Sequence, residues 1–380
     1  MKILCIGSRL FDDVSPYLKE KGYYSIITES NPNAENLNLA DDYFIGPRGM
    51  VFPFNVAIER NVDGVVPLIG IDPPLIDVAA MKQKMEFEYG IPVVASKINP
   101  VRIANDKSKT KELFNSIGVN TPESAYVHKE ELYDFESIIN SAGFTYPVVL
   151  KQNSGQAGKD IKIALSFEDV EEYFTLYGSA LCENFIEGAE ISIETLGWKG
   201  NYLPLVPVYK GDTSIEGIHP IQRIRYGPVN FKNLDNEELR SLALKIAEGL
   251  KFEGNMDLDF IYDYSSSKVY AIEANTRPSG TRYLTQASST INPLEKLIDM
   301  ATGTFNIDEV RDEIQNYYTV EIPVGTFNGE IPDKTFTSKD YVVHGPEKYQ
   351  RITIRSKSKE DLIKRAKELT GMNIELPKNS

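Results

Sequence analysis

Two carboxylates and an amide, spaced to meet across a predicted β-hairpin, are the side chains of this sequence best suited to chemistry. The stretch NMDLDFIYDYSSSKVYAIEANTRPSG alternates β-branched and aromatic residues with others on either side of a Ser-rich break, which predicts strands over 256–262 and 268–274. Because side chains alternate across a strand, Asp259 on the first strand and Glu273 and Asn275 on the second come together. Buried carboxylates need a neutralising cation and all-oxygen ligands favour magnesium, so the spacing predicts a Mg²⁺ site.

A solvated acidic surface is the alternative interpretation of the same hairpin. Asp257 shares the face of Asp259, and acidic residues on a hairpin usually face water. A short motif also carries a real risk of a false match. The hairpin alone therefore leaves both interpretations open.

The overall charge limits the classes of partner. The 380 residues carry a formal net charge of −14, with a pI near 4.9, which argues against nucleic acid or an anionic membrane as the main partner. Cys5 and Cys182 are the only cysteines, so we expect neither a disulfide framework nor a Cys-rich zinc site. No basic-then-apolar leader opens the sequence, and no apolar run approaches the roughly 18 residues that cross a bilayer. We expect a soluble, cytoplasmic protein.

The elements ahead of the hairpin begin with a predicted α/β domain. Residues 1–100 alternate the strand-like runs KILCIGS, YSIIT, DDYFI, DGVVPLIG and IPVVAS with helix-like segments at 10–21, 50–60 and 73–89. This alternation predicts a parallel sheet with right-handed crossovers. The first strand ends in a single Gly7 and not in G-x-G-x-x-G, which argues against a nicotinamide or flavin site.

Asp72 lies in a Gly- and Pro-rich turn after one of these predicted strands. Ligands of open α/β sheets bind beyond the carboxyl ends of the strands, so Asp72 could face a substrate amine. It could equally be the N-cap of the helix that the chain enters through Pro73. The sequence leaves both roles open.

Further along, lysines and glycines stand at the ends of predicted strands and helices. A helix opens at Asp106 and Lys107, and a strand that ends at Lys151 leads into a loop of small residues. Glycines let backbone N–H groups surround phosphate oxygens, and a Lys adds a point charge, although a plain turn is the default for such a loop. Residues 180–197 predict two strands around Gly188, which form either an ordinary hairpin or the wall of an apolar pocket.

A Gly-rich polar loop between strands, residues 209–230, has the composition of a substrate loop. His219, Arg223 and Arg225 could fix a carboxylate there, the arginines bidentately. A structural His and solvated Arg residues are the alternative. A strongly amphipathic helix at 236–251 follows and leads into the hairpin.

The tail, from about residue 307, contains the predicted strands VEIPVGTF and YQRITIRS and the predicted helix KSKEDLIKRAKELTG, capped by Ser356 or Ser358. We find no candidate chemistry in it and expect a structural role.

Five separate stretches of the chain resemble motifs of the ATP-grasp superfamily, and they follow one another in the order that the family has. E-A-N-T-R resembles its E-x-N-x-R signature, D-K-x-x-T-K followed by G-V-x-T-P resembles the opening of the ATP-grasp region, and P-V-V-L-K resembles the P-x-V-x-K strand before its lid. The resemblance implies a mixed α/β and α+β fold. Its parts would be a Rossmann-like domain over 1–100, a small lid subdomain over 101–186, a central subdomain over 187–305 and an α+β tail over 306–380.

The resemblance also implies roles for single residues. Arg277 would be the catalytic cation beside the acyl phosphate. Asp259, Glu273 and Asn275 would hold two Mg²⁺ ions, which Mn²⁺ could replace. The implied ATP contacts are Lys107, Lys151, Ser154, Gly155, Gly158, Glu183, Asn184, Phe185, Ile186 and Glu190.

Within the superfamily the chain looks most like the carbamoyl-phosphate-synthase-like ligases, in particular the amino-acid ligases of pyrrolysine biosynthesis, in its length, its entrance at 102–109 and its compact tail. The resemblance implies an ADP-forming ligase that joins a small, amino-acid-like carboxylate to an amine through an acyl phosphate. A homodimer is compatible with it. The alternatives are an enzyme that phosphorylates bicarbonate, of the carboxylase or carbamoyl-phosphate type, and a nucleotide-binding regulatory protein with a decayed site.

Overall fold

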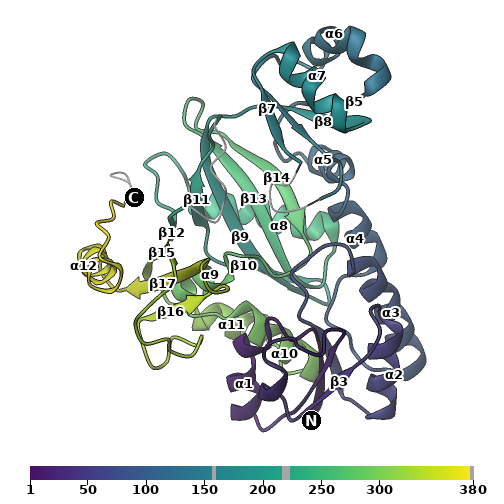
Figure 1. The fold of residues 1–380 in the computed structure, drawn as a ribbon, viewed down its shortest axis with the longest axis vertical. Helices are drawn as coiled ribbons and strands as arrows, with labels where there is room; N and C mark the ends of the chain where they lie inside the picture. The colour runs from purple at the N-terminus through teal and green to yellow at the C-terminus, as the bar shows by residue number, and fades with distance from the viewer. Residues whose placement is uncertain (156–159, 216–222, 377–380) are drawn as a thin grey trace.

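The computed structural model describes residues 1–155, 160–215 and 223–376, which contain three β-sheets (Figure 1). A parallel sheet near the N-terminus lies at the bottom of Figure 1, a small antiparallel sheet at the top, and a large antiparallel sheet between them. This is the predicted combination of α/β and α+β architecture.

The N-terminal sheet is parallel, as predicted. Its order is β3 (Asp42–Ile45), β2 (Tyr24–Glu29), β1 (Lys2–Ile6) and β4 (Gly64–Pro67), with α1 (Ser15–Glu20) and α2 (Val51–Glu59) in the connections. The strand predicted at 91–96 is wrong. Only Val93 pairs, in an isolated bridge with Val65, because Pro92 offers no N–H and the chain bends where Ala95 N–H donates back to Val93.

Three helices link this sheet to the rest of the chain: α3 (Leu75–Tyr89), α4 (Ile98–Ala104) and α5 (Lys107–Ser116), which follow one another up the right side of Figure 1. Helix α5 begins where the sequence predicts, because the Asp106 side chain accepts from the N–H of Lys109. Its end is followed by Gly118 at φ +64°, a conformation that favours glycine. Lys107 is thereby placed in the first turn of the helix.

The small sheet has the order β5 (Ser124–His128), β8 (Ser179–Asn184), β6 (Val148–Lys151) and β7 (Lys162–Ala164), covered by α6 (Phe135–Ser141) and α7 (Phe167–Leu176). Phe135 and Phe174 from the two helices pack with Leu150 of β6 in one buried cluster. This core fixes the end of β6, where Lys151 stands.

The large sheet has the order β14 (Val269–Asn275), β13 (Gly254–Asp263), β9 (Gly188–Trp198), β11 (Val208–Asp212), β12 (Arg225–Gly227), β15 (Tyr318–Gly325), β17 (Gln350–Ser356) and β16 (Tyr341–His344), and β10 (Asn201–Pro204) pairs with β9. Helix α8 (Asn236–Leu250) covers one face, where its Ile246 joins Leu258 and Phe260 of β13 in a buried core. The alternate residues of β13, Asp257 and Asp259, belong to the opposite face.

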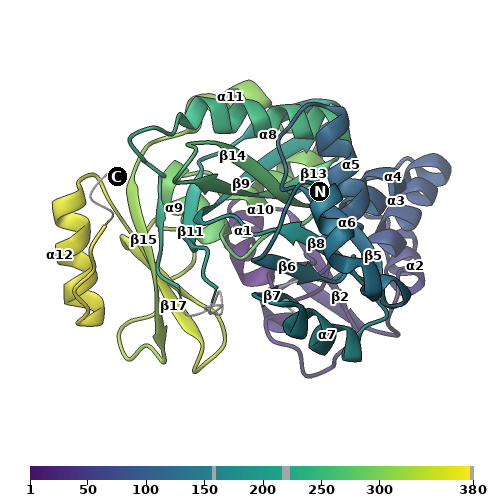
Figure 2. The ribbon, with the colours of Figure 1, turned by 90° about the horizontal axis from the view of Figure 1, so that it is seen from above.

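The tail strands extend this sheet, since β15 pairs with both β12 and β17. Helices α9 (Arg282–Ser289), α10 (Pro293–Thr302) and α11 (Ile307–Glu313) precede them, and α12 (Lys359–Thr370) follows. Ser358 is the cap of α12, since its side chain accepts from Asp361 N–H. Figure 2 shows the tail on one side of the molecule and the N-terminal and small sheets on the other. The domain boundaries stay a prediction.

No helix within the described ranges is long and apolar enough to cross a membrane.

Candidate active site

The predicted hairpin is formed, and its register brings the acidic residues together. Asp259 of β13 lies opposite Glu273 of β14, and Asp257 lies opposite Asn275. A bulge follows Asp259, so the pairing shifts by one residue before Phe260. Directly opposed side chains in an antiparallel pair have Cβ atoms about 5 Å apart, so these four polar groups are neighbours on one face.

Lysines from two other segments neutralise the carboxylates of Asp259 and Glu273. Lys210 Nζ on β11 lies 2.6 Å from Asp259 Oδ1, and Lys107 Nζ lies 3.2 Å from Glu273 Oε1. In the described residues, no three carboxylate, His or Cys groups already converge on one point. Two carboxylates and an amide oxygen are nevertheless a donor set that fits Mg²⁺, which usually takes few protein ligands and completes its shell with phosphate oxygens and water. Asp259, Glu273 and Asn275 are the residues that would hold it.

Two further acids lie buried on the same face and were not among the predicted site residues. Burial, together with the neighbouring charge of Asp259, raises the pKa of Asp257 to about 8. Burial also raises the pKa of Glu194, which lies on β9 directly opposite Asp257 of β13 and accepts from Ser279 Oγ at 2.6 Å. Period-two alternation placed Asp257 on this face, but the pairing of β13 with β9 could not be predicted from the hairpin.

Arg277 joins the hairpin to the N-terminal domain. Its Nε and Nη2 donate to the two carboxylate oxygens of Asp72, the latter at 3.5 Å, and Nη2 also donates to Asn275 Oδ1 at 3.3 Å. The alternative role of Asp72 as a helix cap is wrong, because Pro74 is the N-cap of α3 and no side chain caps it. Arg277 and Asp72, which the sequence offered as separate candidates, are therefore in direct contact.

The start of α5 is tied to the loop after β6. Lys107 N–H donates to Asn153 O at 3.0 Å, and Lys107 Nζ donates to Gly155 O at 2.9 Å. Ser154 lies between these two contacts in the chain. Lys107 therefore lies between the loop and Glu273, while Gly158, the other predicted loop contact, is outside the described residues.

Lys151 forms part of a buried group of three charges. Glu183 Oε2 lies 2.6 Å from Lys151 Nζ, and Glu183 Oε1 lies 2.9 Å from Lys111 Nζ. Burial alone would raise the pKa of Glu183, but the two lysines together lower it. Glu183 is one of the predicted ATP contacts, and its side chain is thus a counterion of Lys151. Lys111 was missed, although it follows Lys107 by one helical turn.

The chain passes from β8 of the small sheet to β9 of the large sheet through residues 184–187, the hinge. The hinge borders a cavity of about 460 Å³. This volume is within the range of small-molecule sites. Three of the predicted ATP contacts line it, together with Glu187 and residues of the β13–β14 hairpin: Asn184, Phe185, Ile186, Glu187, Asp263, Tyr264, Ser265 and Tyr270.

The predicted substrate arginines both face carboxylates. Arg223 Nη1 lies 2.7 Å from Oε1 of Glu190, one of the predicted ATP contacts, and the buried Arg225 donates to Glu321 Oε1 at 3.1 Å. Burial alone would raise the pKa of Glu321, but Arg225, His344 and Arg351 together hold it far below its usual range. His219 lies outside the described residues.

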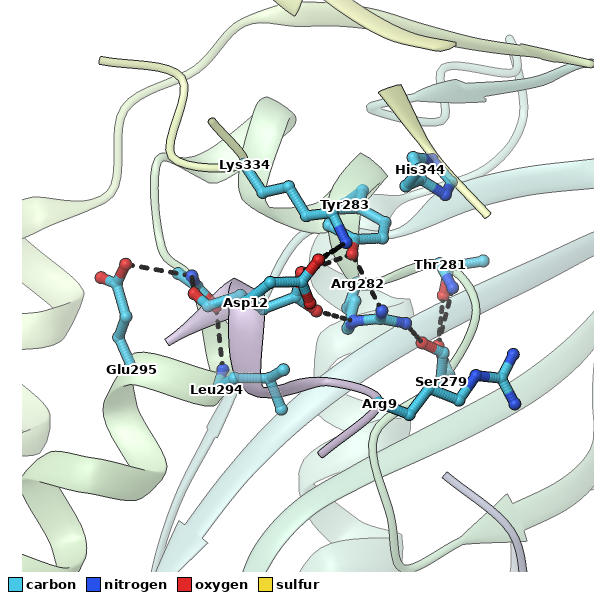
Figure 3. A network of polar contacts seen from close by, with 12 residues as sticks. Arg9, Asp12, Ser279, Thr281, Arg282, Tyr283, Leu294, Glu295, Lys334 and His344 are labelled. Atoms are coloured by element: carbon cyan, nitrogen blue, oxygen red, sulfur yellow. Dashed lines mark hydrogen bonds and ion pairs between the residues drawn. The ribbon is translucent and has the colours of Figure 1, made fainter. Parts of the chain in front are cut away.

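A second polar network anchors the segment just after Arg277 (Figure 3). Arg282 Nε donates to Asp13 Oδ2 at 2.9 Å, and Lys334 of the tail lies 3.5 Å from Asp13 Oδ1. Tyr283 also donates to Asp13 and stacks on His344 with ring centroids 4.0 Å apart. The start of α9 is therefore held by the N-terminal domain and by the tail, in which the sequence offered no candidate chemistry.

Comparisons with known proteins agree with this geometry. Residues 104–281 match the model of the ATP-grasp domain family. A protein of Methanobrevibacter smithii named carbamoyl-phosphate synthase is 52% identical over 372 residues, which cover 97% of this chain and 100% of that protein.

Solved structures share the fold at lower identity. The biotin carboxylase domain of Hydrogenobacter thermophilus 2-oxoglutarate carboxylase, in complex with MgADP, ADP and bicarbonate, is 20% identical with a TM-score of 0.77, covering 97% of this chain and 89% of that chain. N5-carboxyaminoimidazole ribonucleotide synthetase from Thermotoga maritima is 18% identical with a TM-score of 0.71, covering 97% and 98%.

The fold and these matches define the class of the protein, an ATP-grasp enzyme. The chain belongs to the ATP-grasp family, as the sequence motifs implied, and this family uses ATP with Mg²⁺. The narrower likeness to the pyrrolysine-type ligases stays a prediction.

Proposed function

We propose that this enzyme joins a small, amino-acid-like carboxylate to an amine, with an acyl phosphate as intermediate and ADP and phosphate as products. The observation that carries the proposal is the hairpin register, which puts Asp259 opposite Glu273 and beside Asn275. Arg277 donates to Asn275, and Lys107 reaches Glu273, so the cations of the site meet its metal-binding oxygens.

The nucleotide would lie between the hinge and the hairpin. The cavity beside Phe185 and Ile186 could take an adenine ring, because its lining combines these apolar side chains and two tyrosines with polar residues that could pair with the edge of the base. Lys107 and Lys151 would neutralise the phosphates. Mg²⁺ held by the hairpin would withdraw charge from the phosphoryl group during its transfer.

The residues of the chain then have separate tasks in the two steps. In the first, a substrate carboxylate oxygen attacks the γ-phosphorus, the new O–P bond forms, and the bond to the ADP oxygen breaks. Arg277 would donate N–H groups to the oxygens that gain charge. In the second, the amine nitrogen attacks the acyl carbon, phosphate leaves with one carboxylate oxygen, and the nitrogen loses a proton. Asp72, whose carboxylate accepts from Arg277, is the predicted group that would hold the substrate amine.

A second candidate is the phosphorylation of bicarbonate. The name carbamoyl-phosphate synthase of the 52% identical relative favours it, because in that reaction bicarbonate takes the place of the organic carboxylate. The same lysines, arginine and hairpin acids would serve, since the phosphoryl acceptor is a carboxylate-like oxygen in both cases.

ADP release from Mg-ATP, measured over a matrix of amino acids and other carboxylates, separates the two candidates. The first predicts ADP release that requires a carboxylate and an amine together, with an amide in the mass spectrum. Bicarbonate-dependent turnover without amino acids would support the second. Failure to form ADP with any combination would contradict both.

A further inference from the structure

Lys111 is a buried charge next to the nucleotide lysine Lys151, with no role assigned so far. We propose that Lys111 is a positioning residue, which occupies one oxygen of Glu183 and so preserves a net positive charge at Lys151 for the nucleotide phosphates. The inference rests on the proposed function, in which Lys151 faces those phosphates.

The contacts fix Lys111 away from any ligand. Its Nζ donates to Thr121 Oγ1 and to Pro122 O, each at 2.9 Å, and lies 2.9 Å from Glu183 Oε1. Lys111, Lys151 and Glu183 are each 4% exposed. Because its ammonium is already surrounded by protein groups, Lys111 acts through Glu183 and does not itself bind phosphate.

The charge count gives Lys111 its function. Glu183 and Lys151 alone would form a neutral pair, with both carboxylate oxygens free to hold the one ammonium. With Lys111 on the second oxygen, the three side chains carry one net positive charge. Water is largely excluded from all three groups, so this charge is weakly screened and is felt by an anion several ångströms away.

The experiment compares the binding of ADP and adenosine by calorimetry. Lys111→Met should weaken ADP binding by about tenfold and leave adenosine binding unchanged, because only ADP carries phosphates. Adding Glu183→Gln to this variant restores one net positive charge at Lys151, so the ratio of ADP to adenosine affinity should recover. Lys109→Met is the matched control, since Lys109 lies on the same helix with its side chain 57% exposed and should leave both affinities unchanged.

A purely structural role for Lys111 predicts the opposite pattern. Two lost buried contacts would then make the double variant worse than the single one, and either that result or an unchanged ADP affinity in Lys111→Met would overturn the proposal. If Lys111→Met alone does not fold, the double variant is compared with Glu183→Gln alone. The double variant lacks one positive charge, so its ratio of ADP affinity to adenosine affinity must be lower than that of Glu183→Gln. Wild-type protein that binds neither ADP nor ATP would refute the proposed function itself, whereas a normal wild type with an unaffected Lys111→Met refutes only this inference.

Discussion

Replacement of Arg277 by Lys separates a catalytic role from a structural one. The guanidinium contacts both oxygens of Asp72 and the amide oxygen of Asn275. An ammonium keeps the charge but is a compact point donor, so it cannot reproduce this planar arrangement or give two parallel N–H groups to an acyl phosphate. We expect Arg277→Lys to slow ADP formation about a hundredfold or more, about 2.7 kcal/mol or more of lost transition-state stabilisation.

The expected cost in stability is smaller. The side chains of Arg277 and Asp72 are 12% and 18% exposed, so water still reaches the pair, and Lys retains part of the attraction. A loss of about 1 kcal/mol is reasonable for weakening a partly buried charged hydrogen bond. In a chain of this length that loss lowers Tm by only about 2 °C.

The assay is single-turnover ADP formation and thermal melting on the same preparation. Arg282→Lys is the matched control, because it weakens another partly buried ion pair, that of Arg282 with Asp13, outside the proposed substrate and metal contacts, and per folded molecule it should form ADP close to the wild-type rate. A variant Arg277→Lys with a lowered Tm and a near-normal rate per folded molecule would refute the catalytic role. So would an Arg282→Lys variant that loses rate per folded molecule to the same extent.

Three further predictions test the metal, the nucleotide lysines and the buried ion pairs of the tail. Glu273→Gln should abolish ADP formation and leave the circular dichroism spectrum unchanged, and full activity in this variant would exclude Glu273 as a metal ligand. EDTA should abolish ADP formation by the wild type, and added Mg²⁺ should restore it. Lys107→Met and Lys151→Met should each weaken ATP binding but keep the wild-type preference for carboxylate and amine, and an altered preference with normal ATP kinetics would show that they are misplaced. Because the pKa of Glu321 is held below that of an unfolded Glu, near 4.3, its ion pairs stabilise the fold above that pH and are lost as the pH falls. The urea midpoint should therefore decline less between pH 6 and pH 3 in Glu321→Gln than in the wild type, and equal declines would exclude this contribution.

Local patterns in the sequence predicted most of the elements because their signals lie within a few residues of each other. Asp106 caps α5, and Ser358, one of the two serines that the sequence offered as the cap, caps α12. The failure at 91–96 has a local cause as well, since an apolar run with Pro92 cannot donate along its whole length.

The contacts between distant segments could not be predicted in this way. Lys210 of β11 reaches Asp259 of β13 because a single strand, β9, lies between these two strands in the sheet. Glu321 reaches Arg225 because β15 pairs with β12. Strand order is a property of the whole fold and leaves no periodicity in the sequence of either strand. For Lys111 a local signal was present, because four residues after Lys107 it lies on the same face of α5, but its contact with Glu183 depends on the fold as well.

The fate of the carboxylate oxygens tests the central claim most directly. If a substrate carboxylate is phosphorylated and an amine then displaces phosphate, each phosphate released must carry one oxygen from that carboxylate. The measurement is mass spectrometry of the phosphate formed by the wild-type enzyme from Mg-ATP and a pool of amino acids labelled with ¹⁸O in their carboxylates. We predict one ¹⁸O atom in each phosphate that accompanies an amide product. Unlabelled phosphate formed in parallel with an amide would contradict the acyl-phosphate mechanism, and unlabelled phosphate that requires only bicarbonate would contradict the amide-forming activity.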